Sequence, residues 1–377
     1  MTPGRGLRPY AKTQHRATRL GNRRLVLQGI FDDGPISRAG VARATGLGKA
    51  TVSDITSDLI GEGLVVEVGQ GTSTGGKPPT LVELDPDGRF TVAVDLSRHP
   101  VEAALLNLRG RIVDIASGKA LSPTGNDVLE EIHRLVVDLM GAAAAPALGL
   151  GIGVPGTVDD AGRVLASEQL GWTDVQLRDA LEDVYGLPVY VAGDAEVAAV
   201  AEFGRTGSDP TSDMLYVKVD DRIAVGVILG GQLHRTSHRG GDLTHLTIPG
   251  WTKECRCGSS GCLGTELSVI EILGEDYLDL GTDARSRLAA ETAPRVDEAA
   301  RALGRVLAPI VAVLDIDRVV VGGQFAEWPL VPGLAAGVIR ERLNWSVDVV
   351  PSRLGSSAVL LGAAGMVLSG ELGVVWG

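Results

Sequence analysis

The start of the chain shows a helical hydrophobic pattern interrupted by turns. Apolar residues recur at helical spacing through residues 23–31, and Ser37 has a side chain suited to capping a second helix after the break that follows. Residues 45–47, Thr-Gly-Leu, form a short turn, and a third apolar stripe runs through residues 49–61. Two helices joined by a tight glycine-containing turn predict a helix-turn-helix.

Two strand-like runs follow these helices. Residues 64–68 and 80–84 alternate and are rich in β-branched side chains, and the glycine-rich residues 69–77 separate them. They predict the two strands and the tip of a wing, so we expect a winged helix-turn-helix over residues 21–86. Residues 1–20 carry basic side chains without helical apolar spacing and are expected to form a flexible basic arm.

A turn cluster, Asp-Pro-Asp-Gly at residues 85–88, ends this pattern, and strands then alternate with helices. Such alternation predicts an α/β domain over residues 89–377. Strands are expected at residues 90–96, 101–108, 112–116, 148–154, 187–191, 214–219, 223–229 and 318–321, and helices at residues 127–140, 195–203 and 296–314.

The charge of the chain is divided unevenly along its length. The formal net charge is −12, yet residues 1–80 carry +5 and the remainder carries −17. A basic head on an acidic body is the electrostatic pattern expected of a small DNA-reading module carried by a larger domain that avoids phosphates. A basic disordered tail without a partner is the alternative.

The hydrophobic content is 44%, but no stretch reaches the roughly 18 to 20 uninterrupted apolar residues of a membrane span. No apolar segment follows the arginine-rich start to make a signal peptide. These features predict a cytoplasmic protein that does not enter a membrane.

The third predicted helix is the candidate DNA-reading element. Its first residues include Lys49, Thr51 and Ser53, which would meet base edges or phosphates in a major groove. Ser37 precedes the second helix, and Lys77 lies at the wing tip, where glycines allow close approach to the minor groove. A three-helix module that binds protein is the alternative interpretation.

The three cysteines of the chain all lie in one short loop. Cys255, Cys257 and Cys262 fall within eight residues, and His245 lies ten residues upstream. Three thiolates and one imidazole suit tetrahedral zinc, and a set of four protein ligands leaves no open position for water. We expect a structural zinc site; three unligated buried thiols are the alternative.

The cysteine loop, CxCGxxGCL after an upstream histidine, resembles the signature of the ROK family of repressors, open reading frames and kinases. The resemblance covers residues 20–370 and extends to GVPGTVD at residues 153–159, LGW at 170–172 and VVGG at 320–323. It implies a two-lobed, actin-like ATPase fold of the sugar-kinase type, a zinc ion shaping the sugar-binding edge, and homodimers or homotetramers.

The phosphate-binding loops depart from the family pattern. The family kinases begin with Asp-x-Gly-Gly-Thr, whose bare amides approach phosphate, whereas residues 95–99 read Asp-Leu-Ser-Arg-His. Residues 220–224 read Asp-Asp-Arg-Ile-Ala where the family has Gly-Thr-Gly-x-Gly. Lost amides and added carboxylates predict that the protein does not bind ATP.

The sugar site is partly kept. Asp194 matches the general-base position of the kinases, and His245 matches the histidine of their Glu-x-Gly-His motif. Gln169 stands for an asparagine and Asp242 for a glutamate, so the resemblance assigns effector binding to Gln169, Asp194, Asp242 and His245. Glycines at residues 193 and 264 replace further polar groups, which predicts an altered effector.

Together these features predict a transcriptional regulator, most simply a repressor of carbohydrate-related genes that is not an enzyme. It would bind double-stranded operator DNA and change its affinity when a sugar or sugar derivative closes the cleft between two lobes. Two alternatives stay open. One is an effector-independent regulator whose second domain serves as an oligomerisation scaffold, and the other is an active sugar kinase.

Overall fold

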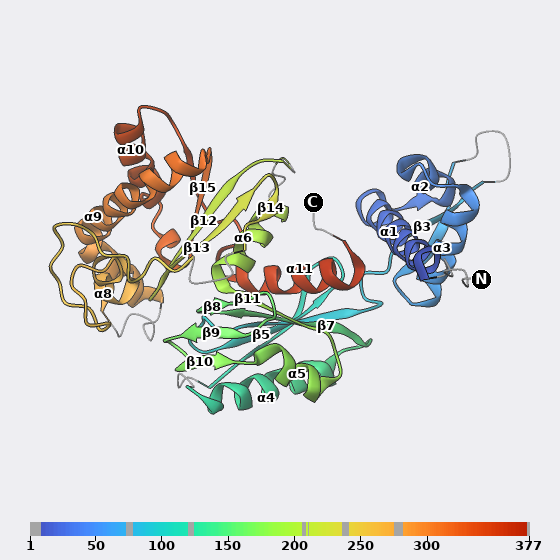
Figure 1. Ribbon diagram of the computed structural model, residues 1–377, viewed down its shortest axis with the longest axis horizontal. Coiled ribbons are helices and arrows are strands. Elements are labelled where there is room, and N and C mark those ends of the chain that lie inside the picture. Colours follow the sequence, from blue (N-terminus) through green and yellow to red (C-terminus); the bar gives the residue numbers. More distant parts are fainter. Residues whose placement is uncertain are drawn as a thin grey trace, which may run out of the picture.

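The computed structural model describes residues 9–72, 78–119, 124–205, 209, 211–235, 241–274 and 282–374. The N-terminal part contains three helices and a small antiparallel sheet of order β1-β3-β2. Figure 1 shows this part as a separate blue body beside the rest of the chain. Its elements are α1 (Pro9–Asp33), β1 (Ile36–Ser37), α2 (Arg38–Thr45), α3 (Lys49–Gly61), β2 (Val65–Gln70) and β3 (Thr80–Leu84).

The winged helix-turn-helix elements lie where the hydrophobic pattern predicted them. Gly46 takes the left-handed conformation (φ 71°) that ends α2, and Ser37 caps the start of α2 by accepting a hydrogen bond from the Gly40 amide. Buried apolar side chains from all three helices form one core that includes Val26, Val52 and Leu59. The strands β2 and β3 pair antiparallel and form the stem of the wing.

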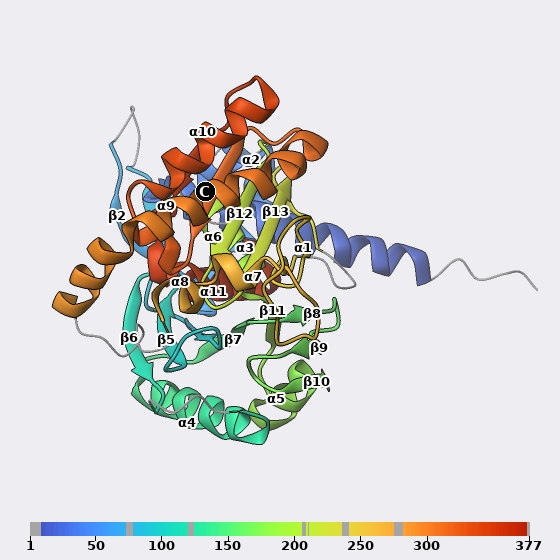
Figure 2. The ribbon, with the colours of Figure 1, turned by 90° about the vertical axis from the view of Figure 1, so that its left-hand side faces the viewer.

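The expectation of an irregular arm at residues 1–20 is wrong from residue 9 onwards. Helix α1 begins at Pro9 and runs without a break to Asp33. Residues 9–20 lack an apolar stripe, but alanine, lysine, arginine and glutamine all favour helix, and an already nucleated helix extends at little cost. Figure 2 shows the N-terminal half of α1 projecting away from the body of the molecule.

The first α/β lobe is built on a mixed five-stranded sheet of order β11-β7-β4-β5-β6. Helix α4 packs against β5 and β6, α5 packs beside β11, and a three-stranded sheet of order β10-β9-β8 lies near one edge. Its elements are β4 (Phe90–Asp95), β5 (Glu102–Asn107), β6 (Ile112–Ser117), α4 (Asn126–Ala142), β7 (Ala147–Val154), β8 (Thr157–Val158), β9 (Val164–Ser167), β10 (Trp172–Val175), α5 (Leu177–Tyr185) and β11 (Val189–Gly193).

The second lobe repeats this architecture on a five-stranded sheet of order β14-β13-β12-β15-β16. Leucines and valines of the long helix α9 share one buried cluster with the strands, and α10 packs on α9. Its elements are β12 (Met214–Val219), β13 (Ile223–Leu229), β14 (Gln232–Leu233), α7 (Gly264–Leu267), α8 (Val269–Leu273), α9 (Thr282–Leu314), β15 (Arg318–Gly322), η2 (Gln324–Glu327), α10 (Val331–Leu343) and β16 (Asp348–Pro351).

Most predicted strands are present, and the strands at 214–219 and 223–229 have the predicted bounds. Helix α9 begins at Thr282 rather than near residue 296, because Pro294 lies inside the helix and did not end it. The hydrophobic pattern of the sequence did not predict α10 or α11 (Ala358–Leu372). Helix α11 is apolar on nearly every side, so it lacks the one-sided stripe that identifies a surface helix.

Two helices, α6 (Asp194–Arg205) and α11, lie between the two sheets. Helix α11 packs on β4 and β7 of the first lobe, α6 packs on β12 and β13 of the second, and the two helices pack on each other. Residues Gly355–Leu372 are long and apolar enough to cross a membrane, but 56% of this segment is buried inside the protein. Burial on all sides explains its composition, so α11 is a core helix.

The winged helix-turn-helix is packed against the first lobe and not simply tethered to it. Its buried side chains form one continuous cluster with Leu368 and Leu372 of α11. Arg109, in the turn between β5 and β6, donates to the Phe31 carbonyl oxygen at 2.6 Å, and its guanidinium lies 4.7 Å from the centre of the Phe31 ring. The division between residues 21–86 and residues 89–377 therefore stays a prediction.

The contact between α6 and α11 is close enough to depend on a glycine. A methyl group on Gly362 of α11 would lie 1.8 Å from the Val197 carbonyl oxygen of α6. Gly362→Ala is therefore expected to destabilise the protein by about 1 to 3 kcal/mol, through overpacking that forces the helices apart. Denaturant unfolding followed by circular dichroism measures the change.

The matched control is Gly337→Ala in α10, where a new methyl group would meet nothing within 4 Å. This substitution should stabilise the protein by about 0.5 to 1 kcal/mol, because alanine loses less backbone entropy in a helix. Equal effects from the two substitutions would contradict the close contact between α6 and α11.

Candidate functional site

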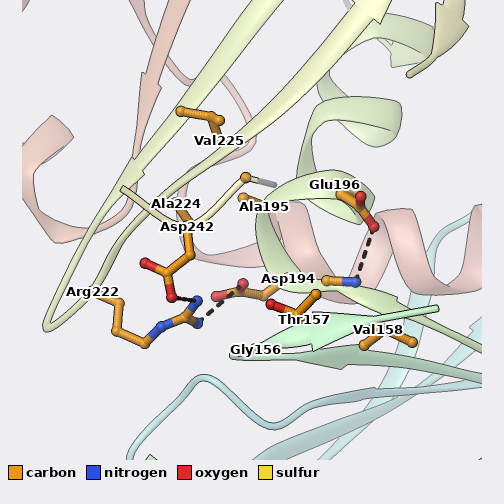
Figure 3. A pocket seen from close by; sticks show the side chains of 12 residues that line it. Gly156, Thr157, Val158, Asp194, Ala195, Glu196, Arg222, Ala224, Val225 and Asp242 are labelled. Atoms are coloured by element: carbon orange, nitrogen blue, oxygen red, sulfur yellow. Dashed lines mark hydrogen bonds and ion pairs between the residues drawn. The ribbon is translucent and has the colours of Figure 1, made fainter. Parts of the chain in front are cut away.

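Charged residues collect where the two lobes face each other. Asp95 ends β4, Asp194 begins α6 directly after β11, Lys218 lies near the end of β12, and Arg222 lies in the hairpin that leads into β13. Strand ends of both sheets therefore bring residues that are far apart in sequence to one place. Figure 3 shows Asp194 and Arg222 pointing toward each other.

Lys218 is the centre of this group. Its Nζ donates to Asp194 Oδ2 at 3.0 Å, to Ser97 Oγ at 3.0 Å and to Asp220 Oδ2 at 2.6 Å, and the side chain is 10% exposed. Burial opposes the charged ammonium, but the carboxylates of Asp194 and Asp220 outweigh burial and raise the pKa of Lys218. The ammonium thus ties the first lobe (Ser97, Asp194) to the second (Lys218, Asp220).

Sequence reasoning did not single out Lys218. The available signal was a single lysine in an otherwise apolar strand, since residues 214–219 are all buried. A buried lysine is rare unless it is paired, so this lysine indicated carboxylate partners without saying which.

Asp95 is buried beneath Lys218. Burial raises the pKa of Asp95 to about 6, against the opposing influence of Lys218. Its Oδ1 accepts hydrogen bonds from the Ser97 amide at 2.9 Å and the Ser97 hydroxyl at 2.6 Å. Lys218, Ser97 and Asp95 therefore form one chain of hydrogen bonds at the place where the resemblance puts the first phosphate loop.

Arg222 makes a second connection across the cleft. Its Nη2 donates to Asp242 Oδ2 at 2.9 Å, and its Nη1 lies 3.8 Å from Asp194 Oδ1. Asp242 in turn accepts from the Thr244 amide at 2.9 Å. Arg222 and the hydrogen bond from Thr244 outweigh burial and lower the pKa of Asp242, which keeps this carboxylate charged.

The cavity beside these residues is small. Its lining includes Gly156, Gly193, Asp194, Arg222 and Asp242, and its volume is about 20 Å³. A cavity of this size holds about one water molecule, whereas small-molecule pockets measure roughly 300 to 1,000 Å³. In this arrangement the Arg222 guanidinium fills space that a ligand would need.

The four predicted effector residues do not form one pocket. Asp194 and Asp242 line the cavity and are joined through Arg222. Gln169 and His245 have separate partners. Gln169 Nε2 lies 2.7 Å from His99 Nε2, and His245 Nε2 lies 3.1 Å from Glu168 Oε2. Glu168, which sequence reasoning missed, belongs to the first lobe and His245 to the second, so this pair also crosses the cleft.

The predicted metal ligands are close together. One donor atom from each of His245, Cys255, Cys257 and Cys262 lies within 4.8 Å of every other. The Cys257 and Cys262 sulfurs are 3.6 Å apart, and Cys255 Sγ lies 3.5 Å from His245 Nδ1. Tetrahedral zinc with bonds of about 2.3 Å to sulfur and 2.0 to 2.1 Å to nitrogen requires separations of about 3.8 and 3.5 Å. The side chains thus fit a tetrahedral metal ion.

The loop also favours thiolate at one ligand. Hydrogen bonds from Ser259 and from Cys255 lower the pKa of Cys257 to about 6. His245 presents Nδ1 to this cluster and Nε2 to Glu168, and a carboxylate on the second ring nitrogen orients a metal-binding histidine. His245 therefore belongs with the metal cluster, next to the cleft.

Three of the five predicted DNA-contacting residues lie on one exposed helix. Lys49, Thr51 and Ser53 are exposed in the first turns of α3. Ser37 lies just before α2, which it caps by accepting a hydrogen bond from the Gly40 amide. Lys77 lies outside the described residues. The assignment of these five residues to DNA stays a prediction.

Basic side chains pair with the acidic groups of this region. Arg19 of α1 lies 2.8 Å from Asp58 of α3, and Arg38 of α2 lies 2.9 Å from Glu67 of β2. Pairing of this kind reduces the repulsion that these carboxylates would exert on phosphate. The paired Asp58 carboxylate of α3 is therefore less unfavourable for DNA than an unpaired one would be.

These features define a class of protein: a winged helix-turn-helix joined to a two-lobed domain of the sugar-kinase type. The sequence matches the ROK family over residues 91–369. It is 31% identical to the xylose repressor of Caldicellulosiruptor bescii over 93% of this chain and 96% of that protein. A glucokinase of Halalkalibacterium halodurans is 29% identical over 63% of this chain and 81% of its own.

The fold has a solved counterpart of the same length. A ROK family transcriptional regulator, a homologue of the Escherichia coli MLC protein, superposes with a TM-score of 0.76 at 21% identity, over 94% of this chain and 96% of that one. The chain belongs to the ROK family. The predicted two-lobed fold with an N-terminal winged helix-turn-helix is confirmed.

The cysteine cluster predicts a bound metal. Cys257→Ser should reduce the bound metal to near zero, because a hydroxyl is a poor substitute for a thiolate. Elemental analysis of purified protein measures the metal, and a thermal melt should show a lower midpoint. Ser260→Ala, at an exposed position of the same loop, is the control and should keep the metal. Equal metal content in the two variants would contradict the ligand assignment.

The buried Asp95 predicts a pH dependence of stability. Folding raises its pKa from 3.8 to about 6, so the folded protein holds the proton more tightly than the unfolded chain. The resulting stability is present below about pH 4 and is lost as the pH rises through about 6. At pH 7.5 the ionised carboxylate opposes folding.

Asp95→Asn removes this charge and should stabilise the protein at pH 7.5 by up to about 3 kcal/mol, with a flatter profile between pH 4 and pH 6. Denaturant unfolding at a series of pH values measures both effects. The exposed Asp114→Asn on β6 serves as the control and should change neither. A less stable Asp95→Asn variant at pH 7.5 would show that Lys218 depends on the Asp95 charge.

Proposed function

We propose that this protein is a transcriptional repressor of carbohydrate-related genes, which binds operator DNA as a homodimer or homotetramer in the cytoplasm. The observation that carries the proposal is a DNA-binding module packed through a continuous core onto a sugar-kinase-like domain. Its relatives over nearly the full chain are repressors. We propose that a sugar or sugar derivative is the effector.

The proposal includes the loss of kinase activity. Asp194 occupies the position of the general base, but its Oδ2 accepts from the buried Lys218 ammonium at 3.0 Å. A carboxylate held in such an ion pair is a weak base toward a sugar hydroxyl. Asp220 replaces a loop glycine and Asp221 replaces the threonine beside it, and their charges oppose a triphosphate. We infer that ATP is not a ligand; ADP release with hexoses or aminosugars would contradict this.

We propose that the metal at the cysteine cluster is zinc and that its role is structural. Four protein ligands complete a tetrahedron and leave no position for water or substrate. The ion would hold the loop at residues 245–262, and through His245 and Glu168 it would fix one side of the cleft.

The fold offers a route from the cleft to the DNA-binding module. Asp194 begins α6, α6 packs closely on α11, and α11 shares its hydrophobic cluster with the winged helix-turn-helix. A change in the angle between the lobes would move α6 against α11 and so reposition the recognition helix α3. Such coupling requires a ligand that binds one lobe arrangement more tightly than the other.

One observation favours the second candidate, an effector-independent regulator. The cavity of about 20 Å³ has no room for a sugar in this arrangement. Fluorescence anisotropy on DNA from the protein's own promoter, at fixed salt and with a panel of neutral sugars, aminosugars and sugar phosphates, separates the two. A change in affinity supports gating, and tight binding that no ligand alters supports the scaffold.

The proposed DNA interface makes a quantitative prediction. Lys49→Ala should weaken binding to operator and to unrelated DNA and lower the slope of log affinity against log salt by about one, because one phosphate contact is lost. Lys119→Ala, an exposed lysine of the first lobe, is the matched control. An unchanged salt slope for Lys49→Ala would remove this end of α3 from the interface.

A further inference from the structure

The Arg222 guanidinium occupies the cleft in the manner of a bound ligand. It lies between Asp194 of the first lobe and Asp242 of the second, and the side chain is only 15% exposed (Figure 3). Its Nη1 is buried and has no hydrogen-bond partner among the residues that the structure describes, although Asp194 Oδ1 lies 3.8 Å away. A cation that bridges two carboxylates across a cleft does what a ligand would do: it holds the two sides together.

The position of Arg222 allows its side chain to rotate out of the cleft. It lies in the short hairpin between β12 and β13, whose last ladder pair joins Val219 and Ile223. The side chain is therefore attached to a turn, and it can rotate away without breaking the strand pairing. Other contacts of the hairpin do not involve the guanidinium: the Ile223 amide donates to Thr244 Oγ1, and Asp220 Oδ1 accepts from the Gln324 amide.

If the Arg222 side chain left the cleft, the carboxylates of Asp194 and Asp242 would lose a positively charged partner. Asp242 would keep hydrogen bonds from the amide and the side chain of Thr244, which carry no full positive charge. Asp194 would keep Lys218, but that ammonium is shared with Asp220 and Ser97. Glu196, whose Oε2 accepts from the Gly193 amide, lines the same cavity and adds a third carboxylate.

A buried carboxylate that loses its positively charged partner destabilises the protein. The hydroxyl of a neutral sugar would compensate only in part, because it offers a dipole where the guanidinium had a full charge. A ligand with an ammonium or guanidinium group replaces that charge directly and can form charge-assisted hydrogen bonds to both aspartates. Displacement of Arg222 therefore discriminates between ligands by charge.

We propose that Arg222 is a built-in ligand of the cleft, and that the effector which displaces it carries a positively charged amine, as an aminosugar does. This inference rests on the proposed function for its assignment of the cleft as the effector site, and it names the class of effector. Arg222 acts as the residue that determines specificity, because every ligand must compete with it.

The test measures ligand binding without DNA. Isothermal titration compares glucosamine with N-acetylglucosamine, which has the same ring but a neutral nitrogen, and with glucose. The native protein should bind glucosamine about tenfold or more tighter than either neutral sugar. Arg222→Ala should bind glucosamine a further tenfold or more tighter, because the internal competitor is gone.

A second measurement uses chemical rescue. Millimolar methylguanidinium should raise the melting temperature of Arg222→Ala by filling the vacated position, and it should not raise that of the native protein. Arg163→Ala is the matched control, since Arg163 also pairs with two aspartates, Asp159 and Asp174, but on an exposed surface of the first lobe. If Arg222→Ala does not fold, Arg222→Lys tests the same competition and should give a smaller gain for glucosamine.

The possible outcomes distinguish this inference from the proposed function. Equal binding of glucosamine and N-acetylglucosamine, or no gain in Arg222→Ala and Arg222→Lys, overturns the role of Arg222. If a neutral sugar alone changes DNA affinity in anisotropy, the gated repressor survives and the amine effector is wrong. If glucosamine binds with the predicted pattern but leaves DNA affinity unchanged, the built-in ligand stands and the gating fails.

Discussion

The buried ammonium of Lys218 is the interaction on which the arrangement of the cleft depends. It satisfies Asp194 and Asp220 and contacts Ser97, so residues from both lobes share a single cation. Unpaired carboxylates at this depth would be strongly unfavourable, and the lobes could not approach as closely without it. Arg222 adds a second cation to the cleft and neutralises Asp242.

This network explains how a kinase-type fold can serve regulation. A catalytic site for phosphoryl transfer needs free carboxylates and bare amides that await substrate. Here a lysine and an arginine of the chain already neutralise the carboxylates, so the cleft is held together by the chain itself. Any effector must compete with these internal contacts. The change in DNA affinity would then depend on how much more strongly the effector binds the carboxylates than Lys218 and Arg222 do.

The position of the DNA-binding module gives the cleft a mechanical connection. Arg109 fixes the end of α1 to the first lobe, while α11 contributes side chains to the hydrophobic cluster of the winged helix-turn-helix. Under the proposed function, a shift of α6 would be transmitted through α11, because packed interiors resist continuous deformation. The contact between Glu168 and His245 also joins the two lobes, and His245 links it to the metal cluster.

The sequence by itself indicated a winged helix-turn-helix followed by an α/β domain, the family, a candidate metal cluster and most strands, because these depend on local patterns and on short motifs such as the cysteine loop. It also placed Asp194 and Asp242 near one site. It did not determine α11, whose all-round burial erased its periodicity, nor the extension of α1 to Pro9. Only the tertiary structure decided that Lys218 and Arg222 fill the cleft, because an ion pair between residues distant in the chain depends on which strand ends meet, and no local pattern records that.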